Sequence, residues 1–193
     1  LLEPTGLMKF EDAVELFKEV VRAGAEAGAD LVMIETMTDL QEARAALLAV
    51  KETCGLPVMV TMTYEERGRT FLGCDPASAA LTLEGMGADA IGVNCSLGPR
   101  EVPPLVEELT KWSDLPIAIK PNAGLPDPGG AGYDITAEEF AQSMAQLTEL
   151  GVKLYGGCCG TTPEYIARMV RALGGREIRQ VPRHVPAAVC SGT

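Results

Sequence analysis

The sequence predicts a fold of the α/β class, with parallel strands that alternate with helices along a chain of 193 residues. Three observations predict it. Short apolar runs alternate with segments whose apolar residues have helical spacing. Glycine, proline or helix-capping residues separate most of these segments. The strand segments are apolar almost without interruption, which is typical of parallel strands covered on both faces. Repeated strand-then-helix units imply a parallel sheet.

The first elements along the chain are a helix, a strand and a second helix. Apolar residues at helical spacing over residues 10–25 predict the first helix, and the apolar run at residues 31–34 predicts the first strand. Asp39 is the predicted start of the second helix, where Glu42 three residues later would complete a capping box. Gly55 is its predicted end.

The rest of the chain repeats this alternation. Further strands are predicted at residues 57–63, 88–95, 115–122 and 152–157. The signals for the following helices are Asp75 with Pro76, the segment 105–112, Thr136 with Glu139 as a capping box, and Pro163.

These elements amount to five strand-helix units with an additional helix in front. A barrel and a doubly wound sheet both fit them, and periodicity does not separate the two. We expect residues 1–175 to form one domain and residues 176–193 to be a linker or tail, because the latter segment has prolines and a small-residue end.

Composition excludes several classes of protein. A hydrophobic content of 47% with 22% charged residues indicates a folded chain. The formal net charge of −11 and the absence of a basic stripe argue against nucleic-acid binding. No apolar run approaches the roughly 20 residues of a membrane span, and the first residues do not resemble a secretory signal. We therefore expect a cytoplasmic protein with no membrane partner.

Three of the six cysteines follow predicted strands. Cys95 closes one strand, and the adjacent pair Cys158 and Cys159 closes another. The carboxyl ends of parallel strands are where ligands bind in α/β folds, so the sequence predicts a metal site at this edge. The alternatives are buried cysteines that act as small apolar side chains, or a redox pair.

Glycines around the cysteine pair support the metal interpretation. Adjacent side chains in a regular strand point to opposite faces, so both thiols reach one ion only if the backbone bends. The sequence GGCCG, residues 156–160, permits such a bend. Three thiolates leave the fourth position of a tetrahedral Zn²⁺ open, as in catalytic zinc sites. A substrate thiol in that position would be held as a thiolate near neutral pH.

Two segments resemble the homocysteine S-methyltransferase family. These are GVNCSLGP at residues 92–99 and GGCCGTTPEYI at residues 156–166. Two others, DLVMIETMTDLQEA at residues 30–43 and PNAGLP at residues 121–126, look most like the homocysteine-binding module of cobalamin-dependent methionine synthases. The resemblance covers nearly the whole chain.

The resemblance implies a (β/α)₈ TIM barrel, of which this chain would hold about five of the eight strand-helix units. It also implies that Cys95, Cys158 and Cys159 carry a catalytic zinc ion and that the thiol of homocysteine is its fourth ligand. The loops of the missing units would contribute to the substrate pocket in a complete barrel.

Three polar residues at the same edge are candidate substrate contacts. The resemblance supports Glu35 as a partner for the ammonium group of an amino acid, and a solvated or ion-paired carboxylate is the alternative. Asn94 and Asn122 are placed to orient the substrate or the metal ligands, and Asn122 fits a turn equally well.

The predicted function is a zinc-dependent homocysteine S-methyltransferase module that forms methionine. By resemblance, methylcobalamin on another domain is the methyl donor, and cobalamin-binding and methyltetrahydrofolate-binding domains are partners. The alternatives are transfer from S-methylmethionine or betaine, a noncatalytic zinc-binding fragment, and a metal-free barrel enzyme that uses Glu35 in acid–base chemistry. Cys54, Cys74, Cys190 and His184 have no predicted role.

Overall fold

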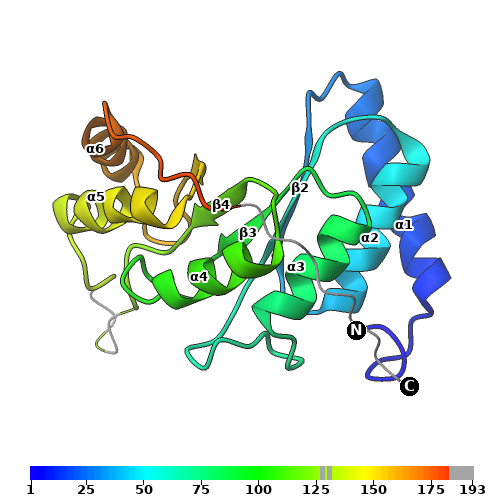
Figure 1. Ribbon diagram of the computed structural model, residues 1–193. Coiled ribbons are helices and arrows are strands. Elements are labelled where there is room, and N and C mark those ends of the chain that lie inside the picture. The colour runs from blue at the N-terminus through cyan, green and yellow to red at the C-terminus, as the bar shows by residue number, and fades with distance from the viewer. Residues whose placement is uncertain (127–128, 130–131, 183–193) are drawn as a thin grey trace.

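The structure is a computed structural model, and it describes residues 1–126, 129 and 132–182. The helices are α1 (Phe10–Glu26), α2 (Leu40–Thr53), α3 (Pro76–Gly85), α4 (Pro103–Trp112), α5 (Ala137–Gln146) and α6 (Pro163–Leu173), with a 3₁₀ turn η1 at Leu147–Leu150 (Figure 1). The strands are β1 (Val32–Met37), β2 (Val58–Met62), β3 (Ala90–Asn94), β4 (Ile117–Lys120) and β5 (Leu154–Tyr155). None of the helices in these described ranges is long and apolar enough to cross a membrane.

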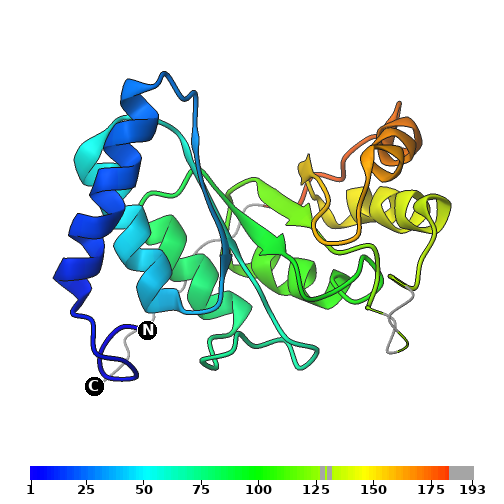
Figure 2. The ribbon, with the colours of Figure 1, turned by 180° about the vertical axis from the view of Figure 1, so that it is seen from behind.

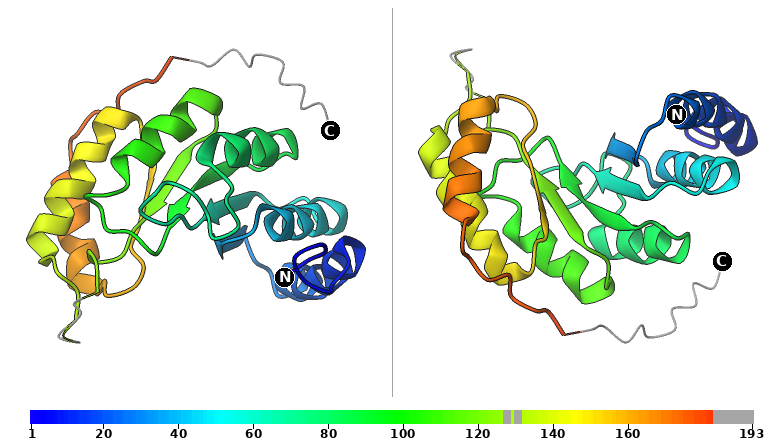
Figure 3. Two further views of the ribbon diagram at one scale, coloured as in Figure 1. Left: turned by 90° about the horizontal axis from the view of Figure 1, so that it is seen from below. Right: turned by 90° about the horizontal axis from the view of Figure 1, so that it is seen from above.

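The five strands form one parallel sheet in the order β1-β2-β3-β4-β5. Spatial order follows chain order without a reversal, whereas a doubly wound sheet reverses direction at its switch point. The helices lie around the outside of the curved sheet, with α1 and α2 at one end of the arc and α5 and α6 at the other (Figures 2 and 3). The described chain is therefore part of a TIM-barrel-like fold, as predicted.

The main core lies between the sheet and the surrounding helices. Alternate strand residues such as Val60, Ile91 and Ile119 point outward and are fully buried against the helices. The opposite, concave face is open: Met33 and Leu154 are 42% and 41% exposed there and line a hollow of about 440 Å³. The expectation that both faces of the strands are covered is thus wrong for the described residues, because the helices cover only the convex face.

The predicted helix starts are confirmed, with one difference in capping. Thr136 and Glu139 form the expected reciprocal capping box of α5. Asp75 caps α3 by accepting a hydrogen bond from the N–H of Ser78. Asp39 caps α2 through the N–H of Gln41, so this end forms an ordinary side-chain cap instead of the predicted capping box.

All five strands differ in length from their predictions: β1 is longer and the other four are shorter, and the differences in β1 and β5 bear on the site. β1 continues past the apolar run to Met37, with an irregularity in its pairing between Ile34 and Met37. β5 contains only two residues, because the chain leaves the sheet after Tyr155. Both departures occur at the carboxyl edge, where the candidate site lies.

The predicted tail begins as an irregular segment. Residues 176–182 contain no helix or strand, and the N–H of Arg179 donates to the carbonyl of Thr148. The remainder of the predicted tail, with His184 and Cys190, lies outside the described residues. The boundary between a domain and a linker at residue 175 stays a prediction.

Candidate metal centre

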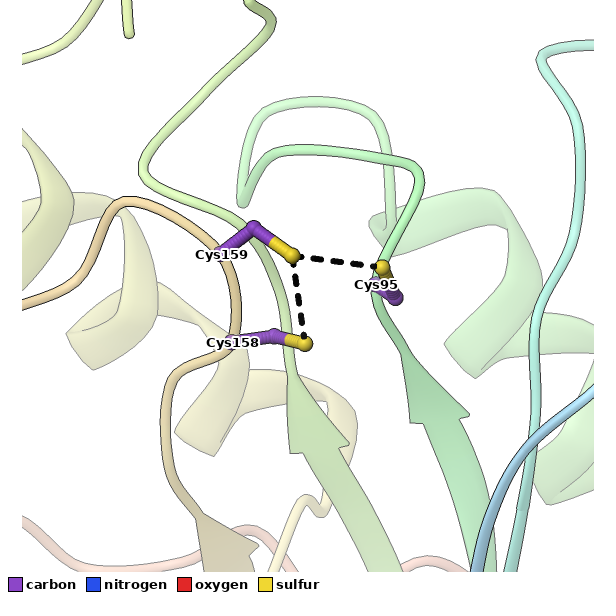
Figure 4. A group of neighbouring side chains, drawn as sticks. All are labelled: Cys95, Cys158 and Cys159. Atoms are coloured by element: carbon purple, nitrogen blue, oxygen red, sulfur yellow. Dashed lines mark hydrogen bonds between the residues drawn. The ribbon is translucent and has the colours of Figure 1, made fainter. Parts of the chain in front are cut away.

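Three thiols converge at the carboxyl edge of the sheet (Figure 4). Cys95 follows β3, and Cys158 and Cys159 follow β5. The Sγ atom of Cys159 lies 3.7 Å from that of Cys95 and 3.9 Å from that of Cys158. All three Sγ atoms lie within 4.8 Å of one another. The structure thus brings the three predicted cysteines together, and their binding of one metal ion stays a prediction.

The spacing of the sulfur atoms fits a tetrahedral metal ion. A Zn–S bond of about 2.3 Å and tetrahedral angles place two thiolate sulfurs about 3.8 Å apart. The two shorter distances here, 3.7 and 3.9 Å, match that value. Three thiol donors are also the chemistry that zinc prefers. The three cysteines are therefore suited to hold a metal ion and leave a fourth position open.

Cys95 reaches the site through a sharp turn. Its φ angle is +62° and that of Ser96 is +54°, and such left-handed angles are uncommon for residues other than glycine. The N–H of Cys95 still bonds to the carbonyl of Lys120 on β4. The turn thus swings the thiol over the strand end while the backbone remains attached to the sheet.

The cysteine pair is held by the loop that follows β4. The N–H of Cys158 donates to the carbonyl of Pro121 at 2.8 Å, and that of Cys159 donates to Oδ1 of Asn122 at 3.0 Å. Gly160 has φ +78°, and a Cβ atom there would lie 2.2 Å from the ring of Tyr133. The predicted bend in GGCCG is present, and it starts once the chain has left β5.

Without a metal ion, the surroundings of Cys95 favour its protonated thiol. Burial is the main cause that raises the pKa of Cys95 to about 11, and the neighbouring thiols of Cys159 and Cys158 add to it. Burial followed by the charge of Cys159 also raises the pKa of Tyr133. A cluster of thiols becomes anionic at neutral pH only when a cation compensates the charges, which is the environment that a metal dication provides.

The side chain of Asn94, at the end of β3, is buried among the neighbouring strand ends. Its Oδ1 accepts from the N–H of Thr36 at 2.8 Å and from the hydroxyl of Thr61 at 2.7 Å. Its Nδ2 donates to the hydroxyl of Thr36 at 2.7 Å and lies 3.8 Å from Sγ of Cys158. The structure places Asn94 at the carboxyl edge of the sheet, next to one of the three clustered cysteines.

Asn122 lies in the loop after β4 and is also buried. Besides its side-chain bond to Cys159, its backbone N–H donates to the carbonyl of Leu97. It therefore joins the loop that carries Cys95 to the loop that carries the cysteine pair. That either asparagine contacts substrate stays a prediction.

Glu35 lies on β1 and points to the open concave face, where it forms an ion pair with Lys120 of β4. Lys120 also contacts the Sδ atom of Met33 at 2.9 Å. The Glu35 side chain remains 51% exposed despite this pair. The sequence analysis did not predict the role of Lys120, because a lysine at a strand end is usually solvated. Only the curvature of the sheet brings it close to Glu35.

The other described cysteines lie apart from the three thiols. Cys54 and Cys74 are half-buried, and neither belongs to the metal-competent group. Cys74 lines a hollow of about 540 Å³ between α2 and α3, which is larger than the one on the concave face. None of the three clustered cysteines lines that larger hollow. The candidate metal site is therefore the thiol cluster and not the larger hollow.

Comparison with known proteins gives one family. Residues 2–173 match the family model described as homocysteine S-methyltransferase. The chain is also 34% identical over 190 residues to a methionine synthase of Mycobacterium leprae (strain TN), and the match covers 94% of this chain and 16% of that protein. The chain therefore spans about one sixth of the length of that relative.

Solved structures show the same relationship. The apo form of the homocysteine methyltransferase MmuM from Escherichia coli has a TM-score of 0.68 and 25% identity, over 82% of this chain and 57% of that chain. Its metallated form has a TM-score of 0.66 and 25% identity, over 81% and 51% of the two chains.

Proposed function

The chain belongs to the homocysteine S-methyltransferase family, and from this premise we propose that it is a zinc-dependent module that methylates homocysteine to methionine. The observation that carries the proposal is the cluster of three thiols at tetrahedral spacing. Cys95, Cys158 and Cys159 would hold the ion, and the open fourth position would receive the thiol of homocysteine. When bound, zinc supplies the positive charge that keeps a substrate thiol ionised near neutral pH.

The residues of this chain hold and orient the reactants. On binding, the thiol of homocysteine would release its proton to solvent. Its sulfur would then attack the methyl group of the donor to form a new S–C bond, while the donor keeps the electron pair of the bond that breaks. Three cysteine thiolates leave the site rich in negative charge, which preserves the nucleophilic character of the substrate sulfur. The neutral thioether of methionine is a weaker ligand than a thiolate, so release of the product is favoured.

We propose that Glu35 binds the ammonium group of homocysteine. Its carboxylate lies on the concave face and keeps half of its surface exposed although Lys120 contacts it. An ammonium group that approaches this exposed side would gain a charge-assisted hydrogen bond. The loops of the units that complete a barrel would provide further contacts to the amino acid.

For the methyl donor we propose methylcobalamin carried by another domain. The support is the 34% identity to a methionine synthase of which this chain spans only 16%. The partners would be cobalamin-binding and methyltetrahydrofolate-binding domains, in the same chain or as separate subunits. A second candidate is a small donor such as S-methylmethionine or betaine, which the similarity to the shorter homocysteine methyltransferase MmuM favours.

Metal analysis and methionine formation test the proposal. The reduced protein should retain about one zinc ion per chain after dialysis, and alanine at Cys95, Cys158 or Cys159 should remove it. Cys54→Ala is the matched control, since this half-buried cysteine lies outside the cluster. A reduced protein that holds no zinc, or equal loss from all four substitutions, would contradict the assignment.

Donor assays distinguish the two forms of the reaction. Methionine should form from homocysteine with methylcobalamin and not with betaine or S-methylmethionine. Activity with a small donor alone would exclude the cobalamin version. Homocysteine binding that persists after zinc removal would instead support a structural metal.

A further inference from the structure

We propose that Asn94 is a positioning residue that holds the thiol of Cys158 in place for the metal, and not a contact to the substrate. The inference rests on the proposed zinc site and concerns how the fold prepares it. Of the two roles expected for Asn94, it selects the orientation of a metal ligand over a contact to homocysteine.

The amide of Asn94 has no bonding capacity left for a ligand. An asparagine side chain offers two acceptor positions on oxygen and two donor hydrogens on nitrogen. The N–H of Thr36 and the hydroxyl of Thr61 occupy the oxygen. The hydroxyl of Thr36 and Sγ of Cys158 occupy the nitrogen. With its side chain 1% exposed, the residue also offers no surface to a substrate.

The orientation of this amide follows from its neighbours. The backbone N–H of Thr36 is only a donor, so the oxygen of Asn94 must face it. The NH₂ group then necessarily faces the opposite side, toward Cys158. A rotated amide would set two donors against each other, which is costly in a buried place.

The partner on β1 is itself in an unusual conformation. Thr36 has φ +62°, in the left-handed region, at the irregularity where the pairing of β1 with β2 shifts. Left-handed angles are unfavourable for residues other than glycine and persist where surrounding contacts hold them. Here both the N–H and the hydroxyl of Thr36 bond to Asn94. The bend in β1 therefore presents two groups to a single side chain on β3.

The consequence is a link from the sheet to a segment that has already left it. Cys158 follows a strand of only two residues, so its own strand gives it little support. Asn94 is tied to β1 through Thr36 and to β2 through Thr61, and it belongs to β3. A donor from this network to Sγ restricts the rotation of the Cys158 side chain before the ion arrives. Such outer contacts to metal ligands commonly change affinity by about 10- to 100-fold.

Zinc affinity of the full chain tests the proposal, measured by competition with a chromophoric chelator. Asn94→Ala should weaken zinc binding by about 10- to 100-fold. Asn94→Asp is a second variant that keeps an oxygen for Thr36 and Thr61 but lacks the NH₂ donor. The added negative charge by itself would attract a cation. Weaker zinc binding in this variant would therefore be due to the loss of the NH₂ donor to Cys158. The thiolate-to-metal absorption of the Co²⁺ form should also shift in both variants.

Thr148→Val is the matched control, because it removes a buried hydroxyl that donates to the carbonyl of Ala145, outside the hydrogen bonds of Asn94. Its zinc affinity should stay close to that of the unchanged protein. Equal losses in Thr148→Val and Asn94→Ala would reduce Asn94 to a packing role and overturn the proposal. Unchanged zinc binding in both Asn94 variants, with or without weaker homocysteine binding, would overturn it as well. If the unchanged protein binds no zinc, the proposed function fails together with this inference.

Discussion

At the scale of the single residue, the role of Glu35 depends on the side chains around it. On β1 it is one of two polar side chains, but the curvature of the sheet brings it to Lys120, which lies 85 positions further along the chain. The pair places a positive and a negative group on the concave face below the thiols. A zwitterionic ligand such as an amino acid can bond to both, and this gives Glu35 a role that can be separated from the metal.

We expect Glu35→Gln to weaken homocysteine binding about 10- to 100-fold, because a hydrogen bond to a charged group contributes about 1.5–3 kcal/mol. The matched ligand is 4-mercaptobutanoate, which has the same thiol and carboxylate but no amine. Its affinity should hardly change. Calorimetry with the zinc-loaded protein measures both, and an equal loss for the two ligands would remove Glu35 from ammonium recognition.

Cys74 gives a second residue-scale prediction, which concerns pH. Burial, with the charge of Asp75 as a smaller cause, raises the pKa of this thiol from its usual 9.0 to about 11. Between these two pH values the thiol is ionised in the unfolded chain and protonated in the folded chain. A rise in pH therefore stabilises the unfolded state relative to the folded state. The free energy of unfolding should therefore fall from about pH 9 to 11.

Denaturant titrations across this range should show a shallower fall for Cys74→Ala than for the unchanged protein. Cys54→Ala is the control, since it removes another half-buried thiol without removing Cys74. An identical pH dependence for the protein and Cys74→Ala would show that this thiol does not retain its proton in the fold.

At the scale of elements, the pairing of β3 with β4 requires a residue without a side chain at position 92. A Cβ atom at Gly92 on β3 would lie 1.8 Å from the carbonyl oxygen of Ala118 on β4. That oxygen belongs to the backbone of a paired strand and cannot move without loss of register. Gly24 on α1 has an ordinary φ angle and nothing within 4 Å of such an atom.

We expect Gly92→Ala to lower the free energy of unfolding by about 1–3 kcal/mol or more, because overpacking moves the backbone. Gly24→Ala should raise it by about 0.4–1 kcal/mol, since alanine loses less conformational entropy in a helix. Thermal or urea unfolding followed by circular dichroism compares the two. A stable Gly92→Ala protein would mean that β3 and β4 are less tightly placed than described.

The open concave face is the main feature at the scale of the whole molecule. Leu31, Met33 and Leu154 are all exposed in one hollow, although such residues are usually buried. β1 and β5 are the two edges of the sheet, and unpaired strand edges invite association. In the described residues neither the hollow nor the edges are covered.

We expect this chain by itself to self-associate as its concentration rises, through burial of the apolar hollow. Leu154→Glu should shift the sedimentation profile toward the monomer. Val170→Glu is the control, because this residue is exposed on α6 outside the hollow. Equal effects of the two substitutions, or a monomer at every concentration, would show that the concave face does not drive association.

Local patterns were enough to predict the order and type of the elements. Apolar periodicity and capping residues such as Asp75 and Thr136 depend on only a few neighbouring residues, so a single sequence is enough to recognise them. The same holds for Cys95 and the cysteine pair, because both follow predicted parallel strands, and all such strands end at one edge.

The tertiary structure alone decided what depends on contacts between distant segments. Barrel and doubly wound sheets have the same local periodicity, and only the strand order separates them. The pairing of Glu35 with Lys120 and the bonds from Asn94 to Thr36, Thr61 and Cys158 join residues on different strands. The sequence by itself thus determined the ligand types and their common edge, because local geometry places strand ends. It could not determine the hydrogen bonds that hold them, because those depend on the curvature of the sheet.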